Sequence, residues 1–165
     1  MNYFMRKNFT VCFGALLAMA MAAPVAAMEG VQSIEQIAVD EVEVNRGADE
    51  LQAVLRPHPD RDVVNTVLAF NNAHRTEVVV RCVAYNANGR PLGKAWVKIP
   101  GNGLRFILAS DIANGRDFVG STRCHSAGKI VPAAFIVGRV LSDTPANSTL
   151  GWGGTKMRFP TVVTY

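Results

Sequence analysis

The sequence lacks most of the patterns that identify an enzyme or a metal site. It has only three cysteines and no CxxC pair, which makes a zinc site a poor interpretation. It has no GxSxG sequence, the pattern of a hydrolase nucleophile elbow. No helical pattern follows its glycine clusters, so they indicate turns and not a phosphate-binding loop. Only 18% of its residues are charged, and repeats and low-complexity tracts are absent.

What the sequence does contain indicates one folded domain of ordinary size. Hydrophobic residues make up 49% of the 165 residues, which is ample for a core and argues against disorder over most of the chain. This length fits a single domain, and a second full domain would be cramped. The periods and spans of collagen, coiled coils and polytopic membrane proteins are missing.

The first 27 residues are predicted to be a cleaved secretory signal peptide. Arg6 and Lys7 precede an apolar run over 11–21, and small residues then lead to a cut after Ala27. A retained membrane anchor is the alternative, because the apolar stretch approaches spanning length. Export implies a periplasmic or extracellular protein. We therefore expect three parts: a signal peptide at 1–27, an acidic arm and linker at 28–60, and a β-sandwich domain at 61–165.

Cys82 and Cys124 remain once the leader is removed. An even pair of cysteines in an exported chain indicates one disulfide. Two buried free thiols or a metal pair are the alternatives. The bridge would close a loop of 43 residues, 82 to 124 inclusive, for which the chain-entropy model gives about 4 kcal/mol of stabilisation.

From residue 61 onward, β-branched and aromatic runs alternate with turn signals, which is typical of short strands. Asn88-Gly89 supplies the positive φ of a tight turn, and Pro160 suits an edge strand or a bulge. We expect strands at 63–71, 77–85, 95–99, 104–109, 118–125, 130–140 and 155–165. The expected core residues are Val67, Phe70, Val80, Val83, Phe106, Ile107, Phe135 and Val137.

About seven short strands over roughly a hundred residues predict an all-β fold, a two-sheet β-sandwich. Four turn motifs then carry a resemblance. They are Asn71-Asn72, Asn86-Ala87-Asn88-Gly89, Pro100-Gly101-Asn102-Gly103 and Gly120-Ser121-Thr122-Arg123-Cys124.

With these motifs, the segment 66–137 resembles uncharacterised exported bacterial domains that have an immunoglobulin-like or fibronectin type III-like sandwich. The resemblance covers about half of the mature chain and implies an immunoglobulin-like fold in an extracytoplasmic location. It carries over no functional residues. An antibody-type domain has a Tyr two residues before its second cysteine, and Thr122 holds that position here.

Charge is unevenly distributed along the chain. Residues 28–50 carry seven acidic side chains and one basic, a net charge of −6, whereas residues 51–165 carry 14 basic and 6 acidic, a net charge of +8. Alternation over Val42-Glu43-Val44 would turn the valines toward a sheet and the carboxylates toward water or arginines. We predict that Ala38–Val44 adds an edge strand, in its own molecule or in a neighbour's through self-association. The alternative is a disordered linker.

Candidates for chemistry are few. The segment His58-Pro59-Asp60-Arg61-Asp62 gathers an imidazole and two carboxylates, but without a complete ligand spacing it indicates a solvated linker. Ser121, His125 and Asp111 can be assembled on paper into a nucleophilic triad, yet no motif supports it. His125 and His74 are interpreted as isolated surface histidines. We predict no catalytic residue, no metal and no cofactor.

The basic residues of the body would form a contact surface if they share a face. Export argues against nucleic acid and favours anionic envelope polysaccharide, lipid headgroups or the acidic arm as the partner. Contact with a bilayer is expected only through an uncleaved leader. Plain solubility is the alternative, because sequence order does not show a shared face. The candidates are Arg75, Arg81, Arg90, Lys94, Lys98, Arg105 and Arg123.

These observations predict an exported, non-enzymatic binding or structural module of the cell envelope or surface. Its partner is an unknown protein or an anionic envelope component. One alternative is a pilus or fibre subunit, because the β-prone segment 161–165 is suited to strand exchange. The other is a secreted hydrolase that uses His125 or the segment 58–62.

Overall fold

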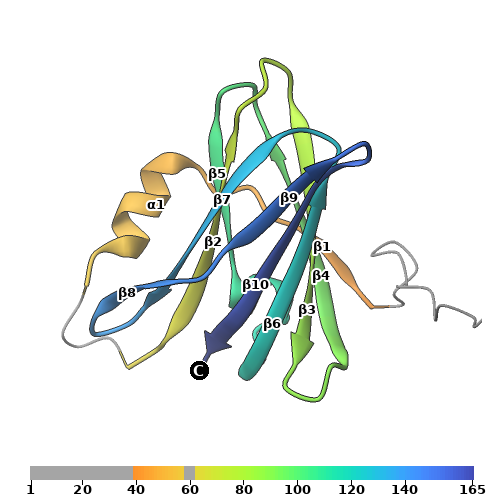
Figure 1. Cartoon of the computed structure of the whole chain (residues 1–165). Coiled ribbons are helices and arrows are strands. Elements are labelled where there is room, and N and C mark those ends of the chain that lie inside the picture. The colour runs from red at the N-terminus through yellow and green to blue at the C-terminus, as the bar shows by residue number, and fades with distance from the viewer. Residues whose placement is uncertain (1–38, 58–61) are drawn as a thin grey trace, which may run out of the picture. The chain divides into compact units, whose positions relative to one another are not determined.

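The computed structural model describes residues 39–57 and 62–165, and most of these residues belong to β-strands (Figure 1). The predicted signal peptide and the first part of the arm lie outside the described residues. The strands are β1 (Glu41–Glu43), β2 (Asn65–Asn72), β3 (Val78–Asn86), β4 (Pro91–Ile99), β5 (Leu104–Leu108), β6 (Phe118–Ser126), β7 (Ile130–Val137), β8 (Leu141–Thr144), β9 (Asn147–Gly151) and β10 (Gly154–Thr164). The helices are α1 (Ala48–Leu55) and α2 (Ala109–Ile112).

Hydrogen bonds connect these strands in one mixed network. Its main path runs β1-β4-β3-β6-β10-β2-β7-β8, while β5 also pairs with β2 and β9 with β10. β10 follows β6 over most of its length and reaches β2 only at Thr164, opposite Asn65. The network therefore consists of two groups of strands joined near the C-terminus. We call them the β3 group (β1, β4, β3, β6, β10 and β9) and the β2 group (β5, β2, β7 and β8).

The two groups pack against each other through a hydrophobic core. The β2 group contributes Leu68, Phe70 and Ile107, and the β3 group contributes side chains such as Val97 and Phe159, all of them fully buried. The rings of Phe70 and Phe159 meet edge to face, with 6.0 Å between their centroids. Burial of these side chains stabilises the fold by about 1.5–3 kcal/mol each.

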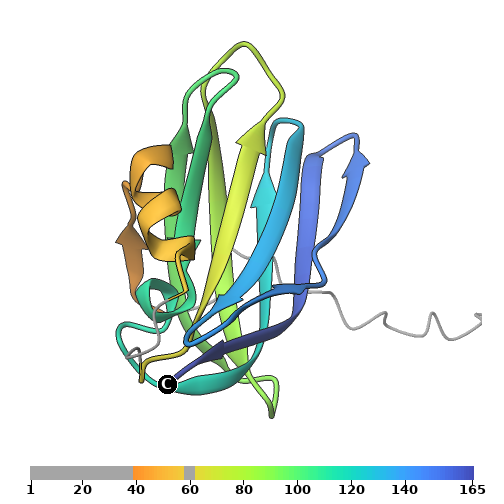
Figure 2. The ribbon, with the colours of Figure 1, turned by 90° about the vertical axis from the view of Figure 1, so that its left-hand side faces the viewer.

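Helix α1 covers the outer face of the β2 group (Figures 1 and 2). Its Leu51 and Leu55 are four residues apart on one side of the helix and pack with Phe106 and Val137 of the strands beneath. Asp49 and Glu50 occupy the first turn, where negative charge favours the helix dipole. Apolar burial on one side and acidic residues in the first turn both favour this helix.

The all-β class is confirmed, but the strand count is higher than predicted. The expected strand 130–140 ends at Val137, because Gly138 and Arg139 turn the chain back into β8. β9 was missed because all five of its residues are exposed, so it carries no hydrophobic alternation. β4 begins at Pro91 and not at Ala95, since the chain leaves the turn at Gly89 directly into the strand.

Most of the predicted core is buried. Seven of the eight predicted residues are fully or nearly fully buried, and Phe135 is partly buried. Val67, Phe106 and Val137 belong to the smaller cluster under α1, which the sequence did not separate from the central core. Pro160 marks a bulge in β10, where the register with β6 shifts between Phe159 and Val162.

The predicted disulfide is present. Cys82 of β3 lies directly opposite Cys124 of β6, with 4.1 Å between the Cα atoms, and both side chains are buried. The bridge therefore joins two neighbouring strands, whereas the bridge of an antibody domain joins its two sheets. Trp96 lies opposite Arg81 on the other face of the ladder, away from the disulfide.

The predicted edge strand of the arm is also present, within the same molecule. β1 pairs in parallel with β4, and the backbone N–H of Val44 donates to the carbonyl of Trp96 at 2.8 Å. Val44 is 7% exposed and Val42 is 38% exposed. Alternation therefore turns both valines to one side, but only Val44 enters the core. The paired segment, Glu41–Glu43, is shorter than predicted.

Candidate functional site

The outward face of the β3 group carries a row of polar and aromatic side chains. Residues directly opposite each other in a ladder point to the same face. Arg81 of β3 lies between Trp96 of β4 and His125 of β6, and His125 in turn lies opposite Lys156 of β10. The register therefore brings side chains of β6 and β10 beside those of the β3–β4 hairpin, which lies far from them in the sequence.

A second row lies two residues further along the same strands. Val83 stands between Lys94 and Arg123, and Arg123 stands opposite Arg158. The rows are about 7 Å apart, because side chains on one face repeat every second residue. We call the following six side chains, all of them exposed or half-exposed, the cationic face: Arg81, Lys94, Lys98, Arg123, Lys156 and Arg158.

Negative charge reaches this face only at its β1 edge, where Glu41 stands beside Lys94 and Glu43 beside Trp96. The structure pairs Arg81 with Glu41 of β1 at 3.9 Å, and both side chains are largely exposed. Among the described residues, Lys94, Lys156 and Arg158 have no ion pair. Like charges directly opposite each other destabilise a sheet. The facing pair of Arg123 and Arg158 therefore opposes folding and is not explained by the stability of the fold.

Two aromatic rings support the cations of the face. The Nζ atom of Lys98 lies 5.5 Å from the ring centroid of Trp96, and the guanidinium carbon of Arg123 lies 5.2 Å from that of Tyr85. Such contacts attract a cation to the electron-rich ring. They limit the freedom of two long side chains that would otherwise move in solvent.

The predicted basic residues divide into two sets. Arg81, Lys94, Lys98 and Arg123 share the cationic face, while Arg75 and Arg90 lie in exposed loops before and after β3. Arg105 of β5 lies opposite Phe70 in the β2 group, and one of its N–H groups donates to the carbonyl of Leu104. It does not belong to the face.

Sequence reasoning missed Lys156 and Arg158. The signal was present in Lys156-Met157-Arg158-Phe159, where charged and apolar residues alternate as in a strand with one solvated face. Met157 and Phe159 are indeed buried and the two cations are exposed. That these cations stand beside Arg123 follows only from the pairing of β10 with β6.

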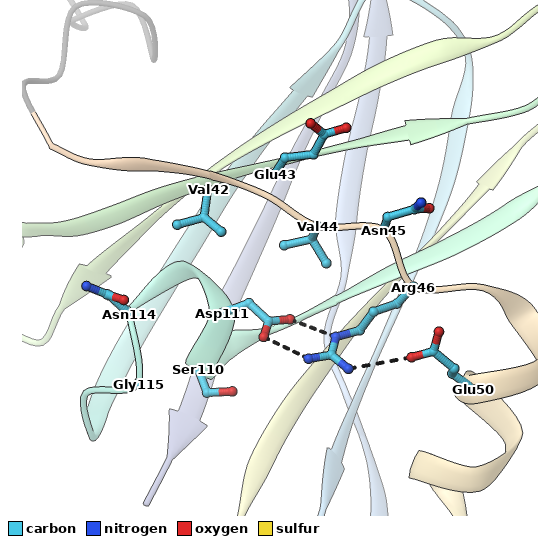
Figure 3. A pocket seen from close by; sticks show the side chains of 10 residues that line it. All are labelled: Val42, Glu43, Val44, Asn45, Arg46, Glu50, Ser110, Asp111, Asn114 and Gly115. Carbon is cyan, nitrogen blue, oxygen red and sulfur yellow. Dashed lines mark hydrogen bonds and ion pairs between the residues drawn. The ribbon is translucent and has the colours of Figure 1, made fainter.

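A depression of about 480 Å³ lies between β1 and α2 (Figure 3). The Arg46 guanidinium occupies its wall, where Nε and Nη2 each donate to a carboxylate oxygen of Asp111 at 3.1 Å. Glu50 lies 3.6 Å from the same guanidinium. The hydrogen bond with Asp111 raises the pKa of Arg46 above its ordinary value, although burial opposes this. The charge of Arg46 is thus balanced by Asp111 and Glu50. We interpret the depression as the place where the arm is attached to the body and not as a ligand site.

The candidate triad is not assembled. Asp111 is engaged by Arg46, and Ser121 and His125 are separated by four residues of β6, about 13 Å in an extended strand. The Nε2 of His125 donates to the carbonyl of Gly153 at 2.8 Å. His74 lies in an exposed loop.

Of the candidate metal segment 58–62, Asp62 belongs to the described residues. His58, Asp60 and Arg61 lie outside the described residues, while Asp62 accepts a hydrogen bond from Arg139 at 2.7 Å. Within 39–57 and 62–165, no group of three or more His, Cys, Asp or Glu side chains could hold a metal ion. A membrane-spanning helix is likewise absent from the described residues.

No protein-family model matches the chain, and comparison with curated proteins and with solved structures found no match.

Proposed function

We propose that this protein is an exported, non-enzymatic binding module of the cell envelope or surface, and that its cationic face holds an anionic component of that envelope. The observation that carries the proposal is the cross-strand pair of Arg123 and Arg158. A sheet gains stability from opposite charges at such a position and loses it from like charges. An external anion between the two guanidinium groups removes the repulsion.

The dimensions of the face favour an extended ligand. Its cations span four adjacent strands, about 14 Å at the usual strand spacing. The side chains stand on an open sheet surface, whereas small-molecule sites are typically concave. Arginine forks bind carboxylate, sulfate or phosphate oxygens in pairs. A polymer or surface with repeated negative charges therefore fits the face better than one small anion.

Export is supported by the disulfide between Cys82 and Cys124, since such bridges persist in oxidising compartments. We also propose that the unit is an immunoglobulin-like two-sheet sandwich. The packing of the β2 group against the β3 group across one core supports this proposal. A pilus-type exchange gains no support, because the C-terminal strand β10 is already paired with β6, β9 and β2.

Binding to dextran sulfate, a soluble polyanion without lipid or nucleobase, tests the proposal. Arg123→Glu combined with Arg158→Glu is expected to weaken binding at least about tenfold, because two attractive contacts with sulfate groups become repulsive. The matched control is Arg56→Glu combined with Arg139→Glu, which changes the net charge equally through exposed residues outside the cationic face.

The control pair is expected to change the dissociation constant by no more than about twofold to threefold. Equal losses in the two double variants would show that only net charge matters and that the face has no special role. Absence of binding by the unaltered protein at low salt would reject the proposal altogether.

A further inference from the structure

We infer that the anionic partner is a phospholipid bilayer surface, and that the turn between β9 and β10 inserts Trp152 into the headgroup region. This inference rests on the proposed function of the cationic face and names its partner. It also departs from the expectation that only the leader contacts a membrane. The Trp152 side chain has a relative exposure of 110%, and that of Leu150 has 62%.

The turn presents Trp152 without burying any of it. Gly151 pairs with Gly154, so Trp152 and Gly153 form the two-residue connection between the strands. An indole that stays fully exposed buries no apolar surface and therefore contributes nothing to the stability of the fold. Tryptophan is enriched at membrane–water interfaces, because its ring is apolar and its N–H still reaches a polar partner.

Contacts at the base of the turn hold it against the rest of the sheet. The carbonyl of Gly153 accepts a hydrogen bond from the His125 ring at 2.8 Å. Gly154 has a φ of +103°, and a Cβ at this position would overlap the carbonyl oxygen of Ser126. Thr155 also donates to the carbonyl of Gly128 at 2.7 Å. These contacts connect the turn to the end of β6. They fix the backbone of the turn, from which the Trp152 side chain projects into solvent.

The charge around the turn suits an anionic bilayer. Residues 118–165 contain five Lys or Arg and a single acidic residue, Asp143. Asp143 and Arg139 both lie toward the other end of β7, in β8 and in the turn before it, while Lys156 follows the turn directly and Lys129 lies in the exposed loop that leads from β6 to β7. Cations beside an interfacial aromatic residue attract anionic headgroups.

An anionic polysaccharide would explain the cations of the sheet equally well. It would not explain Trp152 together with Leu150, since the two project from a hairpin at the end of the sheet, where they do not line the cationic face. Insertion of a hairpin tip uses both features: apolar side chains enter the interface, and the adjacent cations remain at the level of the headgroups.

The test uses the protein purified from an exporting host, with one N-terminus for all variants so that any effect of the leader cancels. Its binding is measured to vesicles of phosphatidylcholine alone, to vesicles that also contain phosphatidylglycerol, and to dextran sulfate. Trp152→Ala is expected to weaken binding to the phosphatidylglycerol vesicles about tenfold and to leave dextran sulfate binding within about twofold.

The control is Val140→Ala, which alters another exposed apolar residue (74%) in the hairpin between β7 and β8. It is expected to leave both affinities unchanged. Brominated phosphatidylglycerol vesicles add a direct readout: they should quench the tryptophan fluorescence of the unaltered protein, and this quenching should be much weaker in Trp152→Ala, which retains only Trp96.

The outcomes separate the inference from the proposed function. If dextran sulfate binds but phosphatidylglycerol vesicles do not, the partner is a soluble or polysaccharide anion and the inference is wrong, while the proposed function stands. If vesicles bind equally well with and without Trp152, binding is purely electrostatic and the insertion is wrong. If neither probe binds, the proposed function fails as well.

Discussion

At the scale of single residues, Asp111 connects the arm to the body through one carboxylate with two kinds of partner. It accepts two hydrogen bonds from Arg46, and its Oδ2 also accepts the backbone N–H of Leu108 at 3.0 Å. The second contact closes the first turn of α2 in the manner of a helix cap. Asp111 should therefore contribute more to the free energy of unfolding than Arg46 does.

Replacement of Arg46 by Ala is expected to lower the free energy of unfolding by about 1–2 kcal/mol, since hydrogen bonds to charged groups are lost at a half-exposed site. Asp111→Ala should cost about 1 kcal/mol more, because the contact with Leu108 is lost as well. Urea unfolding of both variants and of the double variant measures the difference. A larger loss for Arg46→Ala than for Asp111→Ala would contradict the proposed second contribution of Asp111.

The disulfide is a second residue-scale contact with a measurable contribution. Cys82 and Cys124 are both buried, at a sequence separation of 42. Replacement of both by Ala is expected to lower the free energy of unfolding by up to about 4 kcal/mol. Chemical unfolding with and without reductant gives the value, with the unaltered protein as the reference. A loss below about 1 kcal/mol would mean that the reduced unfolded chain is already restricted.

At the scale of elements, β1 is a short parallel strand that is held by one buried side chain. Val44 belongs to the central core, whereas Val42 of the same segment remains 38% exposed. The outward carboxylates add little, because the ion pair of Glu41 with Arg81 is exposed and screened by salt. Apolar burial therefore keeps the arm on β4.

Val44→Ala should reduce the free energy of unfolding by about 2 kcal/mol, the transfer and cavity cost of two buried methyl groups. Val42→Ala is the matched control on the same strand and should cost less than about 1 kcal/mol. Thermal unfolding of the two variants compares them. Equal, small effects would show that the arm is not docked in solution and that the alternative of a disordered linker is correct.

Elements with a hydrophobic pattern could be predicted, and those without one could not. β3 was evident from its apolar run, and β1 from the alternation at Val42-Glu43-Val44. β9 has no buried residue, so no local pattern marks it. α2 is only four residues long and is held by Asp111 and by close packing on Gly93, where a Cβ would overlap the carbonyl of Ile112. Such contacts are tertiary and have no sequence period.

At the scale of the whole molecule, the candidate site depends on long-range pairing. The sequence indicated that the body is basic, but not which cations share a face. Arg81, Arg123 and Arg158 belong to three strands that become neighbours only through the order β3-β6-β10. Strand order is set by the packing of the complete fold and not by local pattern, which is why Lys156 and Arg158 were missed.

The central claim is that the cationic face exists to bind an anion and not to stabilise the fold. The single variant Arg158→Glu separates these roles, because the new carboxylate would lie directly opposite Arg123. An opposite-charge pair at this position should raise the free energy of unfolding by about 0.2–1 kcal/mol. The same change removes a cation from the face and should therefore weaken anion binding.

The decisive measurement is the melting temperature and the dissociation constant for dextran sulfate of Arg158→Glu, both at low salt. We predict a melting temperature that is higher than or equal to that of the unaltered protein, together with binding that is weaker by about threefold to tenfold. A lower melting temperature with unchanged binding would contradict the claim, because Arg158 would then serve the fold and not a ligand.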